Sequence, residues 1–173
     1  MHSQDENPSP PVRTSKSLVV ADRPASRRPA WCGLRARPGE VARARSFASS
    51  EVFGLPFDAY EIGLITSELV TNAVNAARAL GAWPDRMSPI SIRMIATDRY
   101  VHLAVTDPDH RPLAGADRGG RLAEYGRGLS IVDQLAAARW VTYDERSKTV
   151  HVLIAATGVI LSPAELEKVG MPT

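Results

Sequence analysis

Residues 62–80 read IGLITSELVTNAVNAARAL, and this stretch shows most clearly how the chain folds. Its apolar side chains recur three or four positions apart, at Ile62, Ile65, Leu69, Ala73, Ala76 and Leu80. This spacing places them on one face of an α-helix. Because Pro56-Phe57-Asp58 precedes the stretch and Gly81 follows it, we predict one long helix over 56–80 with a buried apolar stripe.

The same stretch carries polar residues away from that stripe. Glu68 and Asn72 are four positions apart, so their side chains share a helix face one turn apart. An amide oxygen can ligate a hard cation such as Mg²⁺, and a carboxylate can orient or deprotonate an attacking hydroxyl or water. Taken alone, the pair fits a solvated polar helix face at least as well.

The rest of the chain supplies strands and two further helices. Alternating apolar and polar residues predict strands at 30–35, 90–96, 101–105, 140–144 and 149–155, with tight connections at 97–99 and 145–148. We predict the additional helices after Pro38, ending at Gly54, and from Gly128. Because strands and helices do not alternate strictly, we expect an α/β two-layer sandwich: a mainly antiparallel sheet with helices on one face.

The positive charge is concentrated at the start of the chain. The 173 residues carry a net charge of +2, yet residues 1–37 hold seven Lys or Arg against three Asp or Glu, which leaves the remainder slightly acidic. The arginines are scattered and no aromatic residue lies among them before Trp31. We therefore predict a disordered basic tail over 1–28 in preference to a nucleic-acid-binding arm, and no direct nucleic-acid partner.

Several classes of protein are excluded or disfavoured by composition. A single cysteine, Cys32, rules out an intramolecular disulfide and a cysteine zinc site. No apolar run approaches the roughly 18 residues of a membrane span, and the cluster at 18–21 is too short for a signal peptide. We expect a cytoplasmic protein. His102 and His151 lie in predicted strands, where solvated or hydrogen-bonded histidines are favoured over the alternative of a metal-binding pair.

Two further segments carry candidate chemistry. Asp107 ends a predicted strand and begins DPDHRP, where its carboxylate could accept hydrogen bonds from an exocyclic amine, or simply form a turn. The run YGRGLSIV over 125–132 leads glycines into a helix, so free backbone N–H groups and Arg127 could bind phosphate. The alternative is a glycine turn before a core helix. The run matches neither a P-loop nor a dinucleotide-binding fingerprint.

As a set, these segments resemble the GHKL nucleotide-binding superfamily, which includes gyrase, the ninety-kilodalton heat-shock chaperone, histidine kinases and mismatch-repair ATPases. The run ELVTNAV resembles its N box, Asp107 the aspartate of its G1 box, and GRGL its G2 box. Together with VTDPDHRP and the final KTV strand, they look most like bacterial anti-sigma serine kinases of the RsbW/SpoIIAB type, in their short actinobacterial form. The resemblance covers about residues 30–156.

The resemblance implies a Bergerat-type ATP-binding fold with a role for each matching residue. Glu68 would be the catalytic base or orienting residue, and Asn72 would hold Mg²⁺. Asp107 would accept the adenine amino group, with Thr149 helping through a water. The phosphates would lie at Gly126, Arg127, Gly128 and Leu129. Residues 108–125 would form a lid over ATP.

The function that the resemblance implies is that of an ATP-dependent protein serine/threonine kinase. It would transfer the γ-phosphate to a serine of an anti-anti-sigma (STAS) protein, sequester a sigma factor, or both. The domain would span 29–156, a loose extension 157–173 would follow with a helical turn after Ser162, and a homodimer is compatible. Alternatives are a non-catalytic scaffold of the same fold, and a detached two-component ATPase domain, which the lack of a phosphoacceptor-histidine helix pair disfavours.

Overall fold

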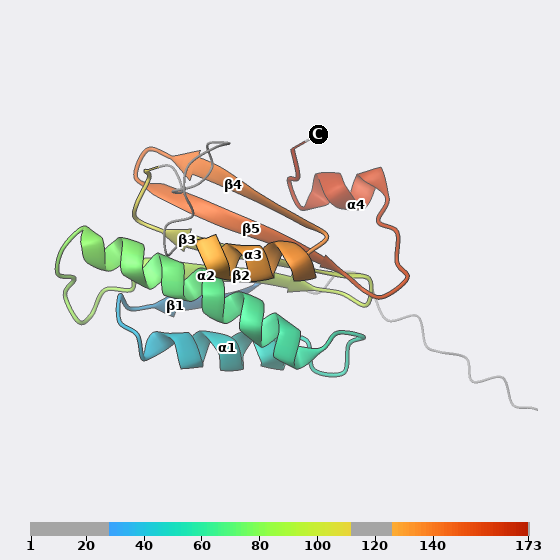
Figure 1. Cartoon of the computed structure of the whole chain (residues 1–173), viewed down its shortest axis with the longest axis horizontal. Helices are drawn as coiled ribbons and strands as arrows, with labels where there is room; N and C mark the ends of the chain where they lie inside the picture. Colours follow the sequence, from blue (N-terminus) through green and yellow to red (C-terminus); the bar gives the residue numbers. More distant parts are fainter. Residues whose placement is uncertain (1–27, 112–125, 173) are drawn as a thin grey trace, which may run out of the picture.

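The structure, a computed structural model, describes residues 28–111 and 126–172 (Figure 1). Within these ranges five strands form one antiparallel sheet in the order β1-β2-β3-β5-β4. The elements are β1 (Ala30–Leu34), α1 (Glu40–Glu51), α2 (Ala59–Ala79), β2 (Ile90–Ala96), β3 (Tyr100–Asp107), α3 (Gly126–Leu135), β4 (Ala138–Asp144), β5 (Ser147–Ala155) and α4 (Pro163–Lys168). Residues 1–27 of the predicted basic tail (1–28) and residues 112–125 of the predicted lid (108–125) lie outside the described residues.

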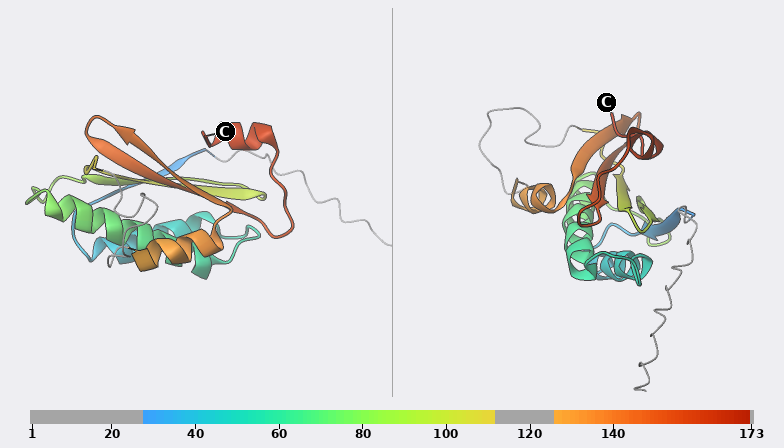
Figure 2. Two further views of the ribbon diagram at one scale, coloured as in Figure 1. Left: turned by 45° about the horizontal axis from the view of Figure 1, so that its top comes forward. Right: turned by 90° about the vertical axis from the view of Figure 1, so that its right-hand side faces the viewer.

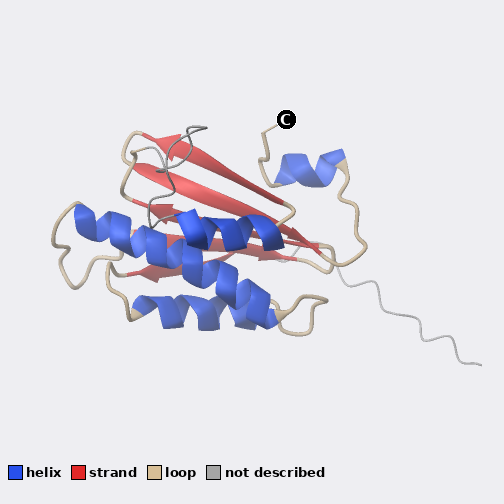
Figure 3. Cartoon of the chain, in the orientation of Figure 1, coloured by secondary structure: helices blue, strands red, loops and turns tan. Residues whose placement is uncertain are grey.

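The sheet and the helices form two layers, as predicted. Helices α1, α2 and α3 cover one face of the sheet, which we call the helix face, and α4 lies against the opposite, outer face (Figure 2, left; Figure 3). The expectation that the helices lie on one face therefore holds for α1 to α3 and not for α4. The antiparallel sheet with helices matches the predicted α/β sandwich.

The core lies between the sheet and the three helices because alternate strand residues point to the helix face. Buried examples from four strands are Leu34, Ile92, Leu103 and Val152. Ile62, Ile65, Leu69 and Ala73 of α2 are buried as predicted. The predicted stripe is wrong beyond Ala73: Leu80 is 47% exposed, and Ala77, not Ala76, is buried, because it continues the four-residue spacing from Leu69 and Ala73.

The C-terminal segment is packed on the outer face, so the expectation of a loose extension is wrong for its described part. Val169 is 5% exposed and forms a second apolar cluster with Tyr100, Trp140 and Leu153. Arg99, in the turn between β2 and β3, donates to Glu165 of α4 at 2.6 Å. Ser162 caps the helix in a reciprocal arrangement with Glu165. The predicted helical turn after Ser162 is confirmed.

Histidines of two neighbouring strands form a hydrogen-bonded row on the outer face. His102 Nε2 lies 3.2 Å from His151 Nδ1, and His151 Nε2 lies 2.9 Å from Thr142 Oγ1. The rings stack with that of Trp140, whose centroid is 4.9 Å from that of His151. Among the described residues no group of three metal-ligating side chains occurs. Both histidines are thus hydrogen-bonded residues of neighbouring strands, which is one of the two arrangements, solvated or hydrogen-bonded, that the sequence favoured.

Candidate functional site

The carboxylate of Asp107 lies at the end of β3 on the helix face and is only 3% exposed. Its Oδ1 atom accepts hydrogen bonds from the backbone N–H of Asp109 at 2.9 Å and from Lys148 Nζ at 2.9 Å. Burial raises the pKa of Asp107, and the hydrogen bond from Lys148 opposes that rise. Within the described part of the chain Oδ2 has no hydrogen-bond partner, so this atom can accept a donor from a ligand.

Lys148 is the residue that the sequence analysis missed. It was expected in a turn over 145–148, and that expectation is wrong: β4 and β5 pair as far as Asp144 and Ser147, which leaves a two-residue turn. Lys148 therefore lies within β5, directly opposite Asp107 in the register of β3 and β5. Its side chain is 5% exposed, and Nζ also donates to the carbonyl of Asp109 at 2.8 Å.

The sequence did contain a signal for Lys148. Val150, Val152 and Ile154 of β5 point to the helix face and alternate with residues that do not. Counting back by two from Val150 places Lys148 on the same face, beside the end of β3. A lysine at that position must donate a hydrogen bond to an acceptor or lose its charge, because burying an unpaired ammonium group destabilises the fold.

The loop after Asp107 is ordered by its own carboxylates up to the last described residue. Asp109 Oδ1 accepts the backbone N–H of Arg111 at 3.1 Å and its Nε at 2.7 Å, and Oδ2 accepts Nη2 at 2.8 Å. The hydrogen bond from the Arg111 side chain is the main reason that the pKa of Asp109 falls to about 2. The chain thus leaves the site through two successive Asx turns, each closed by an aspartate.

Thr149 is not brought to Asp107. It lies on the outer face of the sheet, opposite Thr106 in the register, and their hydroxyl oxygens are 2.8 Å apart. Because strand residues alternate between faces, Lys148 and Thr149 cannot both reach the helix face. The structure places Lys148 beside Asp107 in the position that was expected of Thr149.

Glu68 and Asn72 lie on α2 and are half-buried. The hydroxyls of the neighbouring Thr66 and Ser67 donate to backbone carbonyls four residues earlier, at 2.8 and 2.7 Å. By contrast, the Glu68 and Asn72 side chains have no hydrogen-bond or ion-pair partner within residues 28–111 and 126–172. A carboxylate and an amide oxygen one turn apart and unpaired within the protein fit the needs of a hydroxyl substrate and a hard cation.

The predicted glycine-rich run forms the beginning of α3. This helix starts at Gly126, two residues before the predicted start, so Gly126, Arg127 and Gly128 form its first turn. Backbone N–H groups of a first turn have no partner within the helix and favour anions. Helix α3 packs against α2, and Leu129 packs against the apolar core, which orients that turn.

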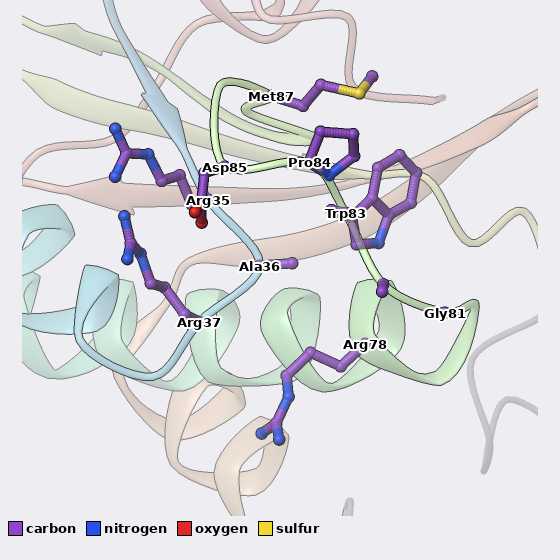
Figure 4. Close-up of a pocket in the computed structure, with 10 residues that line it drawn as sticks. Arg35, Ala36, Arg37, Arg78, Gly81, Trp83, Pro84, Asp85 and Met87 are labelled. Carbon is purple, nitrogen blue, oxygen red and sulfur yellow. The ribbon is translucent and has the colours of Figure 1, made fainter.

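A cavity of about 430 Å³ lies at the C-terminal end of α2 (Figure 4). Arg35 and Arg37 from the segment after β1 and Trp83 from the loop after α2 contribute to its walls. The Trp83 indole is fixed by donation from Nε1 to the carbonyl of Ala77 at 2.8 Å. None of the residues predicted for the functional site lines this cavity, so the cavity is separate from the candidate site.

Comparison with known proteins places most of the chain in a family. A family model described as histidine kinase-like ATPase domain matches residues 34–155. The chain belongs to this family. The match covers α2, the end of β3 and the start of α3, so the candidate residues from Glu68 to Lys148 all lie within the ATPase domain. The resemblance to GHKL domains is therefore confirmed at the level of the family.

A solved structure resembles the ATPase domain at the level of the fold. The RsbU and RsbW domains of Rv1364c from Mycobacterium tuberculosis match with a TM-score of 0.50 and 15% sequence identity, over 79% of this chain and 34% of that one. The chain thus spans about a third of the length of the solved chain. No curated protein matches the sequence. Across the described residues, no helix is long and apolar enough to cross a membrane.

Proposed function

We propose that this chain binds ATP and acts as an anti-sigma regulatory serine/threonine kinase. It would phosphorylate a serine of an anti-anti-sigma protein with a STAS domain, sequester a sigma factor, or do both. The observation that carries the proposal is the buried carboxylate of Asp107, which keeps one oxygen available to a ligand in a histidine kinase-like ATPase domain. Such an acceptor is suited to the exocyclic amine of adenine.

Each residue of the proposed site has a separate task. Asp107 Oδ2 accepts the adenine amine, and the first turn of α3 from Gly126 to Gly128 binds the phosphates through its backbone N–H groups, with Arg127 as a charged donor. Asn72 would hold Mg²⁺ through its side-chain oxygen. That ion, when bound, neutralises charge on the phosphates.

The chemistry is a transfer of the terminal phosphoryl group. The serine oxygen of the partner forms a bond to the γ-phosphorus, and the bond from that phosphorus to the β–γ bridging oxygen breaks, so ADP leaves with the electron pair. Glu68 orients the serine hydroxyl and accepts its proton. Because phosphoryl transfer depends mainly on positioning and charge, the chain needs no nucleophile of its own.

The proposal is tested by titrating the protein with ATP, with and without Mg²⁺, and by assaying phosphate transfer to purified STAS-domain proteins. We expect saturable binding that Mg²⁺ strengthens, and a loss of at least about tenfold in affinity for Asp107→Asn. Glu68→Ala should retain ATP binding and lose phosphate transfer. Glu61→Ala, an exposed change on the same helix, is the matched control and should behave as wild type.

Each alternative function has its own outcome. If the wild-type chain binds ATP and a STAS protein but transfers no phosphate, it is a non-catalytic scaffold. Transfer to a histidine instead of a serine would indicate a detached two-component ATPase domain. Absence of ATP binding at millimolar concentrations would overturn the proposal as a whole.

A further inference from the structure

We propose that Lys148 is a positioning residue of the base site, whose ammonium group keeps the Asp107 carboxylate charged and turned so that Oδ2 meets the exocyclic amine of the nucleotide. This inference rests on the proposed function, because it assumes that Asp107 binds the base of ATP. It adds to that proposal a residue that the structure pairs with Asp107 across strands β3 and β5.

The contacts of the pair are buried and directional. The Lys148 and Asp107 side chains are 5% and 4% exposed, and Nζ lies 2.9 Å from Oδ1. A second ammonium proton is directed at the Asp109 carbonyl, at 2.8 Å, so the position of the ammonium is fixed from two sides. Since both bonds to the Asp107 side chain end at Oδ1, the orientation of the carboxylate is set while Oδ2 stays available.

The charges around Asp107 are few in the described structure. Lys148 of β5 and Asp109 of the following loop face it, the first favouring its ionised form and the second opposing it. Arg111 pairs with Asp109 and not with Asp107. Among the described residues, Lys148 is thus the cation that opposes the rise in the pKa of Asp107 caused by burial.

Removal of this cation has a specific consequence. Burial without an opposing charge favours the protonated carboxyl group, because the charged form loses its solvation. A protonated carboxyl group is a poorer acceptor for an amine donor than a carboxylate. The affinity for ATP should then depend on pH in a way that a purely structural lysine would not produce.

The test compares the dissociation constant of Mg²⁺-ATP between pH 6 and 9 for wild type and Lys148→Met, by calorimetry. Each value is divided by the wild-type value, which cancels the titration of ATP itself. We expect the ratio to be near one at the alkaline end and to grow by up to about tenfold per pH unit as the pH falls. Lys168→Met, an exposed lysine in α4, is the matched control and should follow wild type throughout.

A double variant separates a loss of ATP affinity from a failure to fold. Lys148→Met leaves a buried carboxylate, whereas Asp107→Asn with Lys148→Met leaves no buried charge at that position. If Lys148 acts through Asp107, the double variant should bind ATP within about twofold of Asp107→Asn alone. A further tenfold loss would mean that Lys148 contacts the nucleotide itself and would overturn the positioning role.

The remaining outcomes separate this inference from the proposed function. A Lys148→Met ratio that does not change with pH would overturn the inference and leave ATP binding intact. Wild-type protein that does not bind ATP would overturn both. Should Lys148→Met fail to fold by circular dichroism, the double variant alone decides.

Discussion

His102 carries no charge at neutral pH because of where its ring lies. It is 1% exposed in β3, and its neighbours in the stack are the rings of Trp140 and His151. Burial is the main reason that its pKa falls to about 4, with smaller effects from His151 and Arg93. The unfolded chain has no such environment, so its histidine titrates near its ordinary value.

This difference predicts that the protein is less stable in acid. The folded pKa lies below the unfolded one, so the unfolded chain binds an extra proton below about pH 6.5, and folding stability falls as the pH decreases from there towards 4. The expected loss at pH 4 is about 3 kcal/mol from this residue. Urea unfolding at a series of pH values should show a smaller acid loss for His102→Phe than for wild type.

The exposed His110 supplies the comparison for that experiment. His110→Gln should lose stability in acid as wild type does. An unchanged pH dependence in His102→Phe would show that other groups cause the acid loss.

Of the buried pair Asp107 and Lys148, the sequence singled out the carboxylate but not the lysine that contacts it. Asp107 was found because a carboxylate follows an apolar strand. Lys148 was placed in the connection over 145–148 because the length of that turn is set by strand register, which depends on pairing across the sheet. Thr149 came from the resemblance, and its face follows from the same register.

Among the elements, α2 joins the core to the candidate site. One side of the helix buries Ile62, Ile65 and Leu69, and another presents Glu68 and Asn72. Asp58 caps its N-terminus by accepting from the backbone N–H of Tyr60 at 2.7 Å. The position of the polar pair therefore depends on how firmly the apolar side is packed.

We predict that Ile65→Ala, which removes a fully buried side chain, lowers the free energy of unfolding by about 2–5 kcal/mol. Tyr60→Ala, at a position 77% exposed on the same helix, should change it by less than about 0.5 kcal/mol. Chemical denaturation followed by circular dichroism measures both values. Equal losses in the two variants would mean that α2 is not held by its apolar side.

The helices and strands were largely predictable because the residues that define each one lie close together in the sequence. The long helix was expected over 56–80 and is found over Ala59–Ala79, and the tight connection at 97–99 joins β2 to β3 as expected. The buried side of α2 departed from the predicted stripe towards its end, and the extent to which α4 packs on the sheet was not predictable. Both depend on contacts between segments distant in sequence, which periodicity does not encode.

For the whole molecule, different parts of the chain pack on the two faces of the sheet, and the outer face is covered only in part. Helices α1 to α3 bury the helix face, and the segment from Leu161 to Met171 covers Tyr100, Trp140 and Leu153 on the outer face. The bond between Arg99 and Glu165 fixes this segment to the β2–β3 turn. The C-terminal segment is thus part of the folded unit although it lies beyond the family match at residue 155.

Deletion of residues 157–173 should lower the melting temperature by about 5 °C or more, because it exposes this apolar cluster. The truncated protein should also bind more of a dye specific for apolar surface, such as anilinonaphthalene sulfonate. Ile160→Ser, at a position 90% exposed, is the control and should change neither measurement. A truncated protein as stable as wild type would show that the cluster contributes nothing to the fold.

The strand order also has a consequence for folding during synthesis. Strand β5 is the last in sequence of the five described strands, yet it lies between β3 and β4 in the sheet. Until Ser147–Ala155 has left the ribosome, β3 keeps an open edge and β4 has no partner from this sheet, so the nascent chain carries exposed strand edges until that strand emerges. The pairing of Asp107 with Lys148 forms only when β5 arrives, so the candidate site would be completed after the four preceding strands have been made.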